Sequence, residues 1–257
     1  MAHLPTPPCE QHTLCKCCGG GASLYGVVDF HKSCEEARGK FLSLAGIPVY
    51  YYRCQKCEFI FTTAFDHFSI EDFRRDIYNE SYVLVDPDYL EVRPHANAGV
   101  ISRLFADNKP QAILDYGGGN GQLSDRLRIC GYPLVDTYDP FVPEFSAKPV
   151  RCYDCVVSFE VAEHSTDPLR TFTEMTELLS ERGLILFSTL VQPKEIEQQR
   201  LNWWYAAPRN GHVSLYSRSS LQAIVQRLQF KVGSFSDNLH VLFREVPDFA
   251  KAFLPSS

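Results

Sequence analysis

The run Ile113-Leu-Asp-Tyr-Gly-Gly-Gly-Asn-Gly121 joins a short apolar segment to four glycines within five positions. The apolar residues 112–114 predict a buried strand, and the spacing of apolar residues over 122–129 predicts a helix. Glycines between a strand and a helix let the backbone approach a ligand where a Cβ atom would clash. The run therefore predicts a nucleotide-binding turn at the carboxyl end of the strand.

The spacing of the glycines bears on which nucleotide binds. A dinucleotide fingerprint, G-x-G-x-x-G, needs a third glycine where the helix packs against the strand, and counted from Gly117 that position holds Gln122. The chain has instead Asp-x-Gly-x-Gly-x-Gly starting at Asp115, and a second acid, Asp139, ends another apolar segment. An ordinary glycine-rich turn can carry the same isolated motif. The neighbouring segments therefore have to decide between a nucleotide-binding turn and an ordinary one.

The pattern resembles motif I of class I S-adenosylmethionine (SAM)-dependent methyltransferases, in which the turn passes the methionine part of SAM. The resemblance implies that the later acid, Asp139, accepts hydrogen bonds from the ribose hydroxyls. It also implies a cofactor site formed by Asp115, Gly117, Gly118, Gly119, Gly121, Asp139, Pro140, Phe159 and Glu160.

Two later segments follow the order of the same family. Residues 154–164 read as a buried strand that ends in Glu-Val-Ala-Glu-His, and Asp167-Pro168 then begins an amphipathic helix. The run 183–190 resembles the next strand of the family. Over about residues 78–244 the resemblance implies an α/β fold, a Rossmann-like, seven-stranded, mostly parallel sheet with helices on both faces.

The segment between Asp139 and Asp154 is shorter than in this family. Relatives normally place a helix, a third strand and an acid that holds the adenine amine there. No adenine-binding carboxylate can therefore be assigned in this chain. Phe141 either lies beside the adenine or belongs to the core.

The cysteines predict a metal site. Ten cysteines in a cytoplasmic enzyme are better explained by metal binding than by disulfides. Cys15 with Cys18, and Cys54 with Cys57, form two C-x-x-C pairs that each place two thiolates on one side of a tight turn. Together they predict a structural Zn²⁺ site of the zinc-ribbon type; reduced, partly buried thiols are the alternative. Cys17 lies where it could replace a ligand.

Composition limits the possible partners. The formal net charge of -6 argues against a broad basic surface for nucleic acid. No apolar run approaches the roughly 20 residues of a membrane span, and the amino end lacks a secretory segment. We expect a cytoplasmic protein with neither nucleic acid nor membrane as a partner.

The chain divides into three predicted parts: a flexible arm over residues 1–13, a zinc-ribbon-like module over 14–65, and the methyltransferase domain with N-terminal capping helices over 66–257. The charged insertion 26–45 within the module either contacts substrate or is a solvated loop. Ser69-Ile-Glu-Asp72 resembles a helix-capping signal.

Two tyrosines precede the glycine turn. Tyr78 and Tyr82, four residues apart, would share one face of a helix. Similar methyltransferases carry a tyrosine-bearing helix over the SAM pocket, so the resemblance implies that both contact the cofactor; packing on the core is the alternative. Arg93 is either a partner of the SAM carboxylate or a surface arginine.

Methyl transfer needs alignment of nucleophile, methyl and sulfur, and a base if the nucleophile starts protonated. His212 is our first candidate for that base and His164 the second, with Glu163 as a helper, because these residues fall where the family places substrate-facing groups. Helix capping and loop fixation are their alternative roles. The long aromatic connection 191–210, which contains Trp203 and Trp204, is typical of a lid or specificity wall.

Only the resemblance to known methyltransferases indicates which molecule accepts the methyl group. A cysteine-rich module joined to a SAM domain is similar to some sugar and natural-product methyltransferases, including deoxysugar C-methyltransferases, whose additional carboxyl-terminal domain this sequence does not show. We therefore expect O-methylation of a small molecule such as a sugar, a glycan precursor or a natural product. Carbon, nitrogen or protein methylation, and a non-catalytic SAM-binding sensor or scaffold, are the alternatives.

Overall fold

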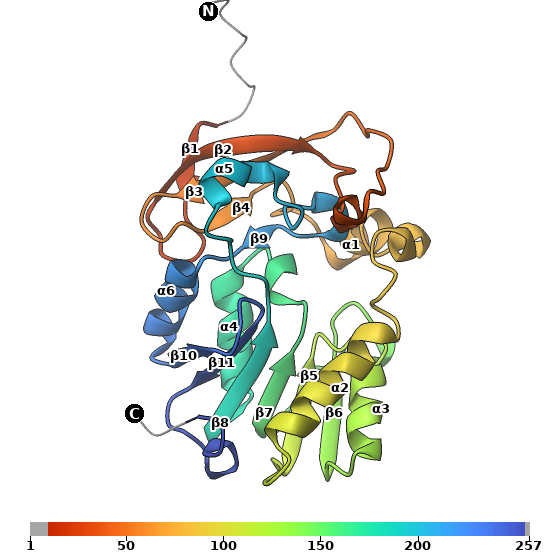
Figure 1. Ribbon diagram of the computed structural model, residues 1–257, viewed down its shortest axis with the longest axis vertical. Helices are drawn as coiled ribbons and strands as arrows, with labels where there is room; N and C mark the ends of the chain where they lie inside the picture. Colours follow the sequence, from red (N-terminus) through yellow and green to blue (C-terminus); the bar gives the residue numbers. More distant parts are fainter. Residues whose placement is uncertain (1–9, 255–257) are drawn as a thin grey trace, which may run out of the picture.

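The computed structural model describes residues 10–254, which form two sheets with helices around the larger one (Figure 1). The larger sheet has the strand order β10-β11-β8-β7-β5-β6, in which β5 pairs in parallel with β6 and β7, and β7 with β8. β11 and β10 add an antiparallel edge. The strands are β5 (Ala112–Tyr116), β6 (Leu134–Tyr138), β7 (Tyr153–Ser158), β8 (Leu179–Ser188), β10 (Lys231–Ser234) and β11 (Leu239–Phe243).

Helices cover both faces of this sheet, because its central strands are apolar at consecutive positions, whose side chains point to opposite faces. Ile113 of β5 clusters with Ile101 of α2 and with α3, whereas its neighbour Leu114 clusters with Phe172 of α4 and with α6. The helices are α1 (Ile70–Asp76), α2 (Val92–Leu104), α3 (Gln122–Ile129), α4 (Pro168–Glu177), α5 (Ile196–Gln199) and α6 (Arg218–Leu228). This sandwich confirms the predicted α/β fold class. No helix within residues 10–254 has the length and apolar character to cross a membrane.

The number of strands differs from the prediction. In the described residues the sheet has six strands rather than seven, and β6 forms its edge. Between β6 and β7 the chain contains only one short 3-10 turn, Pro143–Phe145. A parallel strand needs a crossover of a dozen or more residues, so this connection leaves no length for a helix and another strand.

The smaller sheet is antiparallel and includes a strand from the far end of the chain. Its order is β1-β2-β3-β4-β9, and β4 pairs with β9 through Ile60–Leu215 and Phe61–Ser214. Figure 1 shows this sheet lying across the end of the larger sheet toward which β7 and β8 point. Its strands are β1 (His12–Leu14), β2 (Gly21–Asp29), β3 (Pro48–Cys54), β4 (Ile60–Thr62) and β9 (Ser214–Leu215).

The predicted arm over residues 1–13 lies mostly outside the described residues. Its last two residues contradict the prediction, since His12 and Thr13 belong to β1 and pair with Ser23 and Ala22 of β2. Backbone hydrogen bonds to the neighbouring strand therefore order this end of the arm.

The segment before α2 begins as predicted and then departs from the prediction. Ser69 and Asp72 form the reciprocal capping box at the start of α1. Tyr78 and Tyr82 do not share an α-helix, because α1 ends at Asp76 and Tyr82 lies in a separate 3-10 helix, Glu80–Leu84. The Asn79 side chain, which accepts the Ser81 N–H, caps that second helix and breaks the first.

Candidate functional site

The glycine turn requires glycine at several of its positions. Gly117, Gly119 and Gly121 have positive φ values of 73°, 55° and 77°, which side chains rarely adopt. A Cβ atom on Gly117 would lie 2.4 Å from Val161 Cγ2, and one on Gly118 would lie 2.5 Å from Asp115 Oδ2. The turn thus brings bare backbone to the end of β5.

Asp139 lies across this turn, directly after β6. Its Oδ2 accepts the Gly119 N–H at 2.9 Å and its Oδ1 accepts the Phe141 N–H at 2.8 Å. Burial raises the pKa of this carboxyl, and the backbone hydrogen bonds oppose that rise. Each oxygen has a second lone pair, so the carboxylate can still accept a ribose hydroxyl.

Asp115 supports the turn from beneath. Its side chain is 2% exposed, and Oδ2 accepts the Ser124 hydroxyl at 3.3 Å. Burial raises the pKa of this carboxyl to about 7. The side chain also lies close under the turn, because a Cβ atom on Gly118 would be 2.5 Å from Oδ2.

A cavity of about 990 Å³ opens between the glycine turn, the tyrosine segment and the end of β7. Its volume lies at the upper end of the range for ligand sites, which leaves room for SAM and an acceptor together. Among the predicted cofactor residues, Gly121 is the exception, because it starts α3 rather than lining the cavity. The predicted residues on its walls are Tyr78, Tyr82, Asp115, Gly117, Gly118, Gly119, Asp139, Pro140, Phe159, Glu160 and His164.

The two tyrosines meet although no helix joins them. Their rings pack edge to face with centroids 5.3 Å apart, and Tyr78 makes a similar contact with Phe141 at 5.2 Å. Phe141 thus belongs both to the core and to the cavity wall. Buried Arg209 holds the segment by donating to the Ile77 carbonyl and to the Ser81 hydroxyl. The sequence analysis missed Arg209, because nothing in its local pattern separates a buried arginine from a surface one.

Glu160 and Arg93 form the charged wall of the cavity. Glu160 has a left-handed backbone, with φ at 55°, a conformation that persists only where neighbouring contacts hold it. Here the Glu160 N–H donates to Ser188 Oγ at 2.9 Å, and the Ser188 hydroxyl donates to Glu160 Oε1 at 2.8 Å. Arg93 Nη1 lies 3.6 Å from Glu160 Oε2, and Nη2 pairs with Asp86. Arg93 therefore lines the cavity rather than the outer surface.

The two candidate histidines lie one behind the other. His164 lines the cavity, whereas His212 is 5% exposed and packs behind it, with ring centroids 4.9 Å apart. This order is the reverse of our sequence-based preference for His212 as the base. Burial holds the pKa of His164 well below its usual range and lowers the pKa of His212 to about 4. Both imidazoles are consequently neutral near pH 7.

Glu163 completes a cluster with these histidines. Its side chain has no exposed area, and Tyr205 donates its hydroxyl to Oε1 at 2.6 Å. Oε2 is buried and has no hydrogen-bond partner among residues 10–254. Burial, with a smaller contribution from Glu160, raises the pKa of this carboxyl to about 8. One ligand-type atom from each of Glu163, His164 and His212 lies within 4.8 Å of the others.

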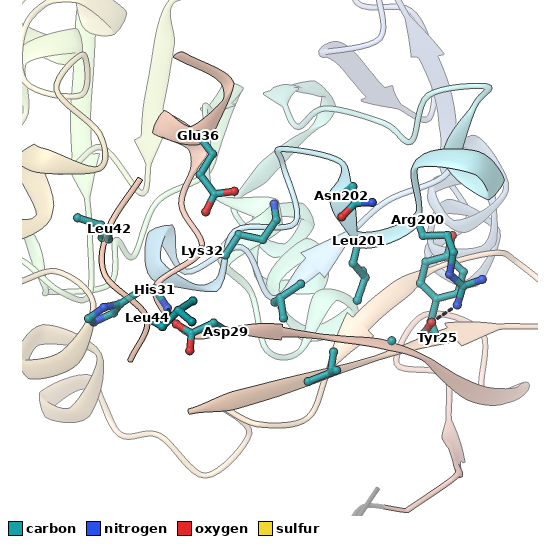
Figure 2. Close-up of a pocket in the computed structure, with 13 residues that line it drawn as sticks. Tyr25, Asp29, His31, Lys32, Glu36, Leu42, Leu44, Arg200, Leu201 and Asn202 are labelled. Atoms are coloured by element: carbon teal, nitrogen blue, oxygen red, sulfur yellow. Dashed lines mark hydrogen bonds between the residues drawn. The ribbon is translucent and has the colours of Figure 1, made fainter. Parts of the chain in front are cut away.

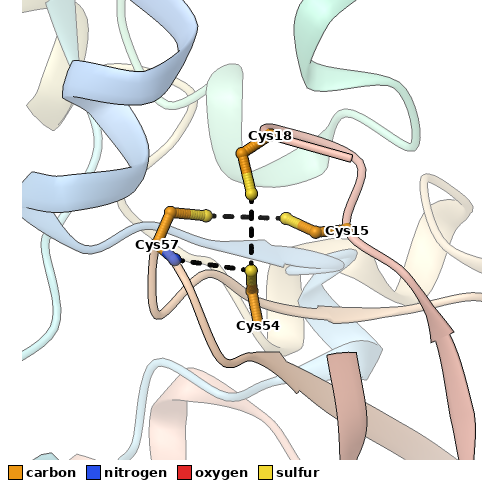
Figure 3. A group of neighbouring side chains, drawn as sticks. All are labelled: Cys15, Cys18, Cys54 and Cys57. Atoms are coloured by element: carbon orange, nitrogen blue, oxygen red, sulfur yellow. Dashed lines mark hydrogen bonds between the residues drawn. The ribbon is translucent and has the colours of Figure 1, made fainter. Parts of the chain in front are cut away.

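The four predicted zinc ligands come together in the smaller sheet (Figure 3). Their sulfurs lie 3.5 Å apart in the pairs Cys15–Cys57 and Cys18–Cys54. Zn–S bonds of about 2.3 Å in a tetrahedron imply sulfur separations of about 3.8 Å, close to this geometry.

Backbone amides support the same four sulfurs. The Gly20 N–H donates to Cys18 Sγ, and the Lys56 and Cys57 N–H groups donate to Cys54 Sγ. Such donors stabilise thiolates, so the residues present fit a zinc ion with four sulfur ligands. Cys17 is buried and its sulfur lies outside the four-sulfur cluster.

The insertion 26–45 joins the module to the aromatic connection. Asp29 accepts the His31, Ala45 and Gly46 N–H groups, which closes the insertion on itself. Lys32 donates to the Trp203 carbonyl at 3.0 Å. A groove of about 410 Å³ lies between the two segments (Figure 2), lined by Tyr25, Asp29, His31, Lys32, Glu36, Leu42, Leu44, Arg200, Leu201 and Asn202 among others.

The aromatic connection departs from its predicted role as a lid or specificity wall. Trp203 and Tyr205 are buried in a cluster with residues of the smaller sheet, and neither tryptophan lines the 990 Å³ cavity. Of the three aromatic residues at positions 203–205, Trp204 is the exposed one, at 39%. Burial of these large rings fixes the connection against the module instead of leaving it free to close over a ligand.

The fold and the site together define a class I SAM-dependent methyltransferase with an N-terminal four-cysteine module. A family model described as a methyltransferase domain matches residues 89–234, more than half of the chain. The chain belongs to this family. No curated protein matches it.

Several solved structures are similar to this chain at low sequence identity. An O-methyltransferase family protein from Burkholderia thailandensis has a TM-score of 0.52 and 13% identity, over 70% of this chain and 64% of its own. This chain therefore spans less than two thirds of that protein. The plantazolicin methyltransferase BpumL has a TM-score of 0.48 and 15% identity, over 67% and 93%. Magnesium protoporphyrin IX methyltransferase from Synechocystis PCC 6803 has a TM-score of 0.47 and 17% identity, over 68% and 94%.

Proposed function

We propose that the chain transfers the methyl group of SAM to an oxygen of a small-molecule acceptor. The observation that carries this proposal is the 990 Å³ cavity, whose walls include the glycine turn, Asp139 and His164. A cavity of that size accommodates a cofactor and a second small ligand side by side. An acceptor of the size of a sugar or a natural-product fragment fits this space better than a folded protein surface does.

The cavity walls suggest how SAM binds. The methionine part lies along Gly117 to Gly119, with its carboxylate toward Arg93, the cation of the charged wall. The ribose hydroxyls donate to Asp139, whose two oxygens already accept one backbone N–H from the glycine turn (Gly119) and one from Phe141. Tyr78 and Tyr82 close the cavity from the opposite side.

The histidine pair supplies the chemistry for an O–H acceptor. Transfer is an in-line displacement in which the acceptor oxygen bonds to the methyl carbon as the carbon–sulfur bond breaks. His164, on the cavity wall, takes the proton from the acceptor hydroxyl. His212 orients it from behind, and its own ring is fixed by a 2.9 Å contact between Nδ1 and the Tyr205 carbonyl.

The zinc module has a structural role in this proposal. Four sulfur ligands leave no open position on Zn²⁺, so the ion braces the smaller sheet and takes no part in transfer. The module over residues 14–65 and the methyltransferase domain over 66–257 form one working unit, because β4 and β9 belong to one sheet.

Transfer of a labelled methyl group tests this function. The chain is incubated with methyl-labelled SAM and a metabolite-containing cell extract, and the products are separated into macromolecular and small-molecule fractions. We expect label in the small-molecule fraction, bound through an ether or ester oxygen, and much less of it with Asp139→Ala at the same SAM concentration. Label confined to protein, or to a carbon or nitrogen atom, would overturn the proposal.

A further inference from the structure

Glu163, His164 and His212 form a cluster of metal-ligand type outside the four-cysteine site. Their candidate ligand atoms, one carboxylate oxygen and two imidazole nitrogens, all lie within 4.8 Å of one another. Glu163 and His164 follow β7, whereas His212 comes from the connection that leads into β9. Two separate parts of the chain therefore converge on one point beside the cavity.

The Glu163 carboxylate has an unused oxygen inside this cluster. The side chain is fully buried, Oε1 accepts the Tyr205 hydroxyl at 2.6 Å, and the Thr189 hydroxyl is near enough to the carboxyl to oppose the rise in its pKa. Oε2 has no hydrogen-bond partner in residues 10–254. A buried carboxylate oxygen without a partner costs free energy, and a cation between the three side chains would satisfy it.

One ring nitrogen of His212, Nδ1, already makes a hydrogen bond within the protein, as in many metal sites. Nδ1 lies 2.9 Å from the Tyr205 carbonyl, so it carries the proton and donates it, which leaves the lone pair on Nε2. Metal-ligating histidines commonly donate their other N–H to a backbone carbonyl in this way. Tyr205 thus holds two ligands at once, Glu163 through its hydroxyl and His212 through its carbonyl.

We propose that Glu163, His164 and His212 bind a divalent transition-metal ion at the wall of the SAM cavity. One carboxylate and two imidazoles form the donor set of catalytic zinc sites, which keep a further position open. His164 lines the cavity, so the open position lies on the side where the acceptor would bind. This site is distinct from the four-cysteine cluster, which is closed.

The ion adds a step to the proposed function, namely activation of the acceptor, and this role of the ion rests on that function. It binds the acceptor oxygen, orients it toward the methyl group and lowers the pKa of its hydroxyl. With the imidazole lone pairs used as ligands, His164 holds the ion instead of taking the proton, and the ion-bound hydroxyl releases its proton to solvent water as the acceptor oxygen attacks the methyl carbon. Catechol-like or vicinal diol groups, which present two adjacent oxygens, are the acceptor class that suits such an ion.

Cobalt titration of the zinc-loaded full chain tests the site without any activity measurement. Co²⁺ bound by nitrogen and oxygen gives weak visible bands, and Co²⁺ bound by thiolates gives strong charge-transfer bands, so the two sites are distinguishable. We expect one additional Co²⁺ per chain, with the weak bands only. Glu163→Gln and His212→Asn should each weaken this binding by at least about 100-fold, since even outer-shell changes cost 10–100-fold.

A matched variant and a second readout make the result decisive. His95→Asn, which changes an exposed histidine, should bind Co²⁺ like the wild type. SAM binding, measured on the same preparations, reports whether the Glu163→Gln and His212→Asn variants are folded. No Co²⁺ beyond the four-cysteine site, or Co²⁺ binding that neither variant weakens, would overturn the inference. Co²⁺ binding without methyl transfer would overturn the proposed function instead.

Discussion

Asp115 is the carboxyl in the cavity whose ionisation the fold opposes most clearly. Burial raises its pKa from 3.8 to about 7. Between these two values the folded chain holds a proton that the unfolded chain has lost, so this group's contribution to the free energy of unfolding falls as pH rises from about 4 to about 7.

The variant Asp115→Asn tests this effect. Asparagine cannot ionise, so the stability of the variant relative to the wild type should rise by about 3 kcal/mol between pH 5 and pH 8. Urea unfolding of SAM-free protein at both pH values measures the difference. The variant Asp107→Asn, at an exposed position, serves as the control. Parallel pH profiles for Asp115→Asn and the wild type would refute the raised pKa.

His164 is the residue on which turnover should depend most directly. We expect His164→Gln to lower the turnover rate by about 10²–10⁴-fold, whether the imidazole takes the proton itself or holds the ion that lowers the pKa of the acceptor hydroxyl. SAM affinity should stay near the wild-type value, because the glycine turn and Asp139 are unchanged. Steady-state kinetics with the acceptor found in the labelled extract, and His95→Asn as control, provide the measurement. An unchanged turnover rate would remove His164 from the chemistry.

Single residues differed in how far the sequence could predict them. The glycines after β5 were predictable because a tight turn after a strand permits few residue types. The relative depth of His164 and His212 was not, since it depends on how the aromatic connection packs against the smaller sheet. The unpaired oxygen of Glu163 arises from contacts between distant segments, which no local pattern records.

Among the elements, the turn between β5 and α3 is the most sensitive to substitution. In Gly118→Ala the new methyl group would lie 2.5 Å from Asp115 Oδ2 and 2.8 Å from Thr137 Cγ2. We expect a loss of about 1–3 kcal/mol in the free energy of unfolding, together with weaker SAM binding.

Gly99→Ala in α2 is the matched control. Its Cβ atom would meet only Arg103 Nη1 at 3.4 Å, at the end of a flexible side chain. Alanine favours helix over glycine by up to about 1 kcal/mol, so this variant should be neutral or slightly stabilised. Urea unfolding of both variants measures the contrast. Equal stabilities would contradict the close packing described for the turn.

Elements with strong periodicity were predicted accurately. The helix over 122–129 and the helix opened by Asp167-Pro168 both agree with α3 and α4. The prediction that one helix carries both Tyr78 and Tyr82 was wrong, because α1 ends at Asp76 and Asn79 caps a separate 3-10 helix. Side-chain caps of this kind compete with apolar spacing, and the spacing alone does not indicate which of them prevails.

At the scale of the whole molecule, the four-cysteine module is built into the methyltransferase. β9 extends the smaller sheet, the Ser217 hydroxyl donates to the Cys57 carbonyl at 2.7 Å, and Arg227 donates to the Cys17 carbonyl at 3.0 Å. Cysteine spacing predicted the module, but these contacts join residues far apart in the sequence. In the described residues the larger sheet has six strands because the connection between β6 and β7 is short, and no sequence motif predicts this.

Loss of zinc should therefore destabilise the whole chain. We expect Cys57→Ser to lose the sulfur-bound zinc and to lower the melting temperature by about 10 °C or more in a single transition, because several kcal/mol of metal binding contribute to folding. Cys130→Ser, at an exposed cysteine, should keep both the zinc and the melting temperature. Metal analysis with calorimetric melting gives both values. If the methyltransferase domain of Cys57→Ser still unfolds at the wild-type melting temperature, the module does not contribute to the stability of that domain.

Calorimetric titration of the full chain with SAM tests the central claim most directly, namely that the cavity beneath the glycine turn binds the methyl donor. We predict one SAM per chain, competition by S-adenosylhomocysteine, and an affinity lowered about 10–100-fold by Asp139→Ala but not by Asp107→Ala, since hydrogen bonds to a charged group contribute about 1.5–3 kcal/mol. Absence of binding, or equal affinity in Asp139→Ala and the wild type, would contradict the assignment of this cavity to SAM.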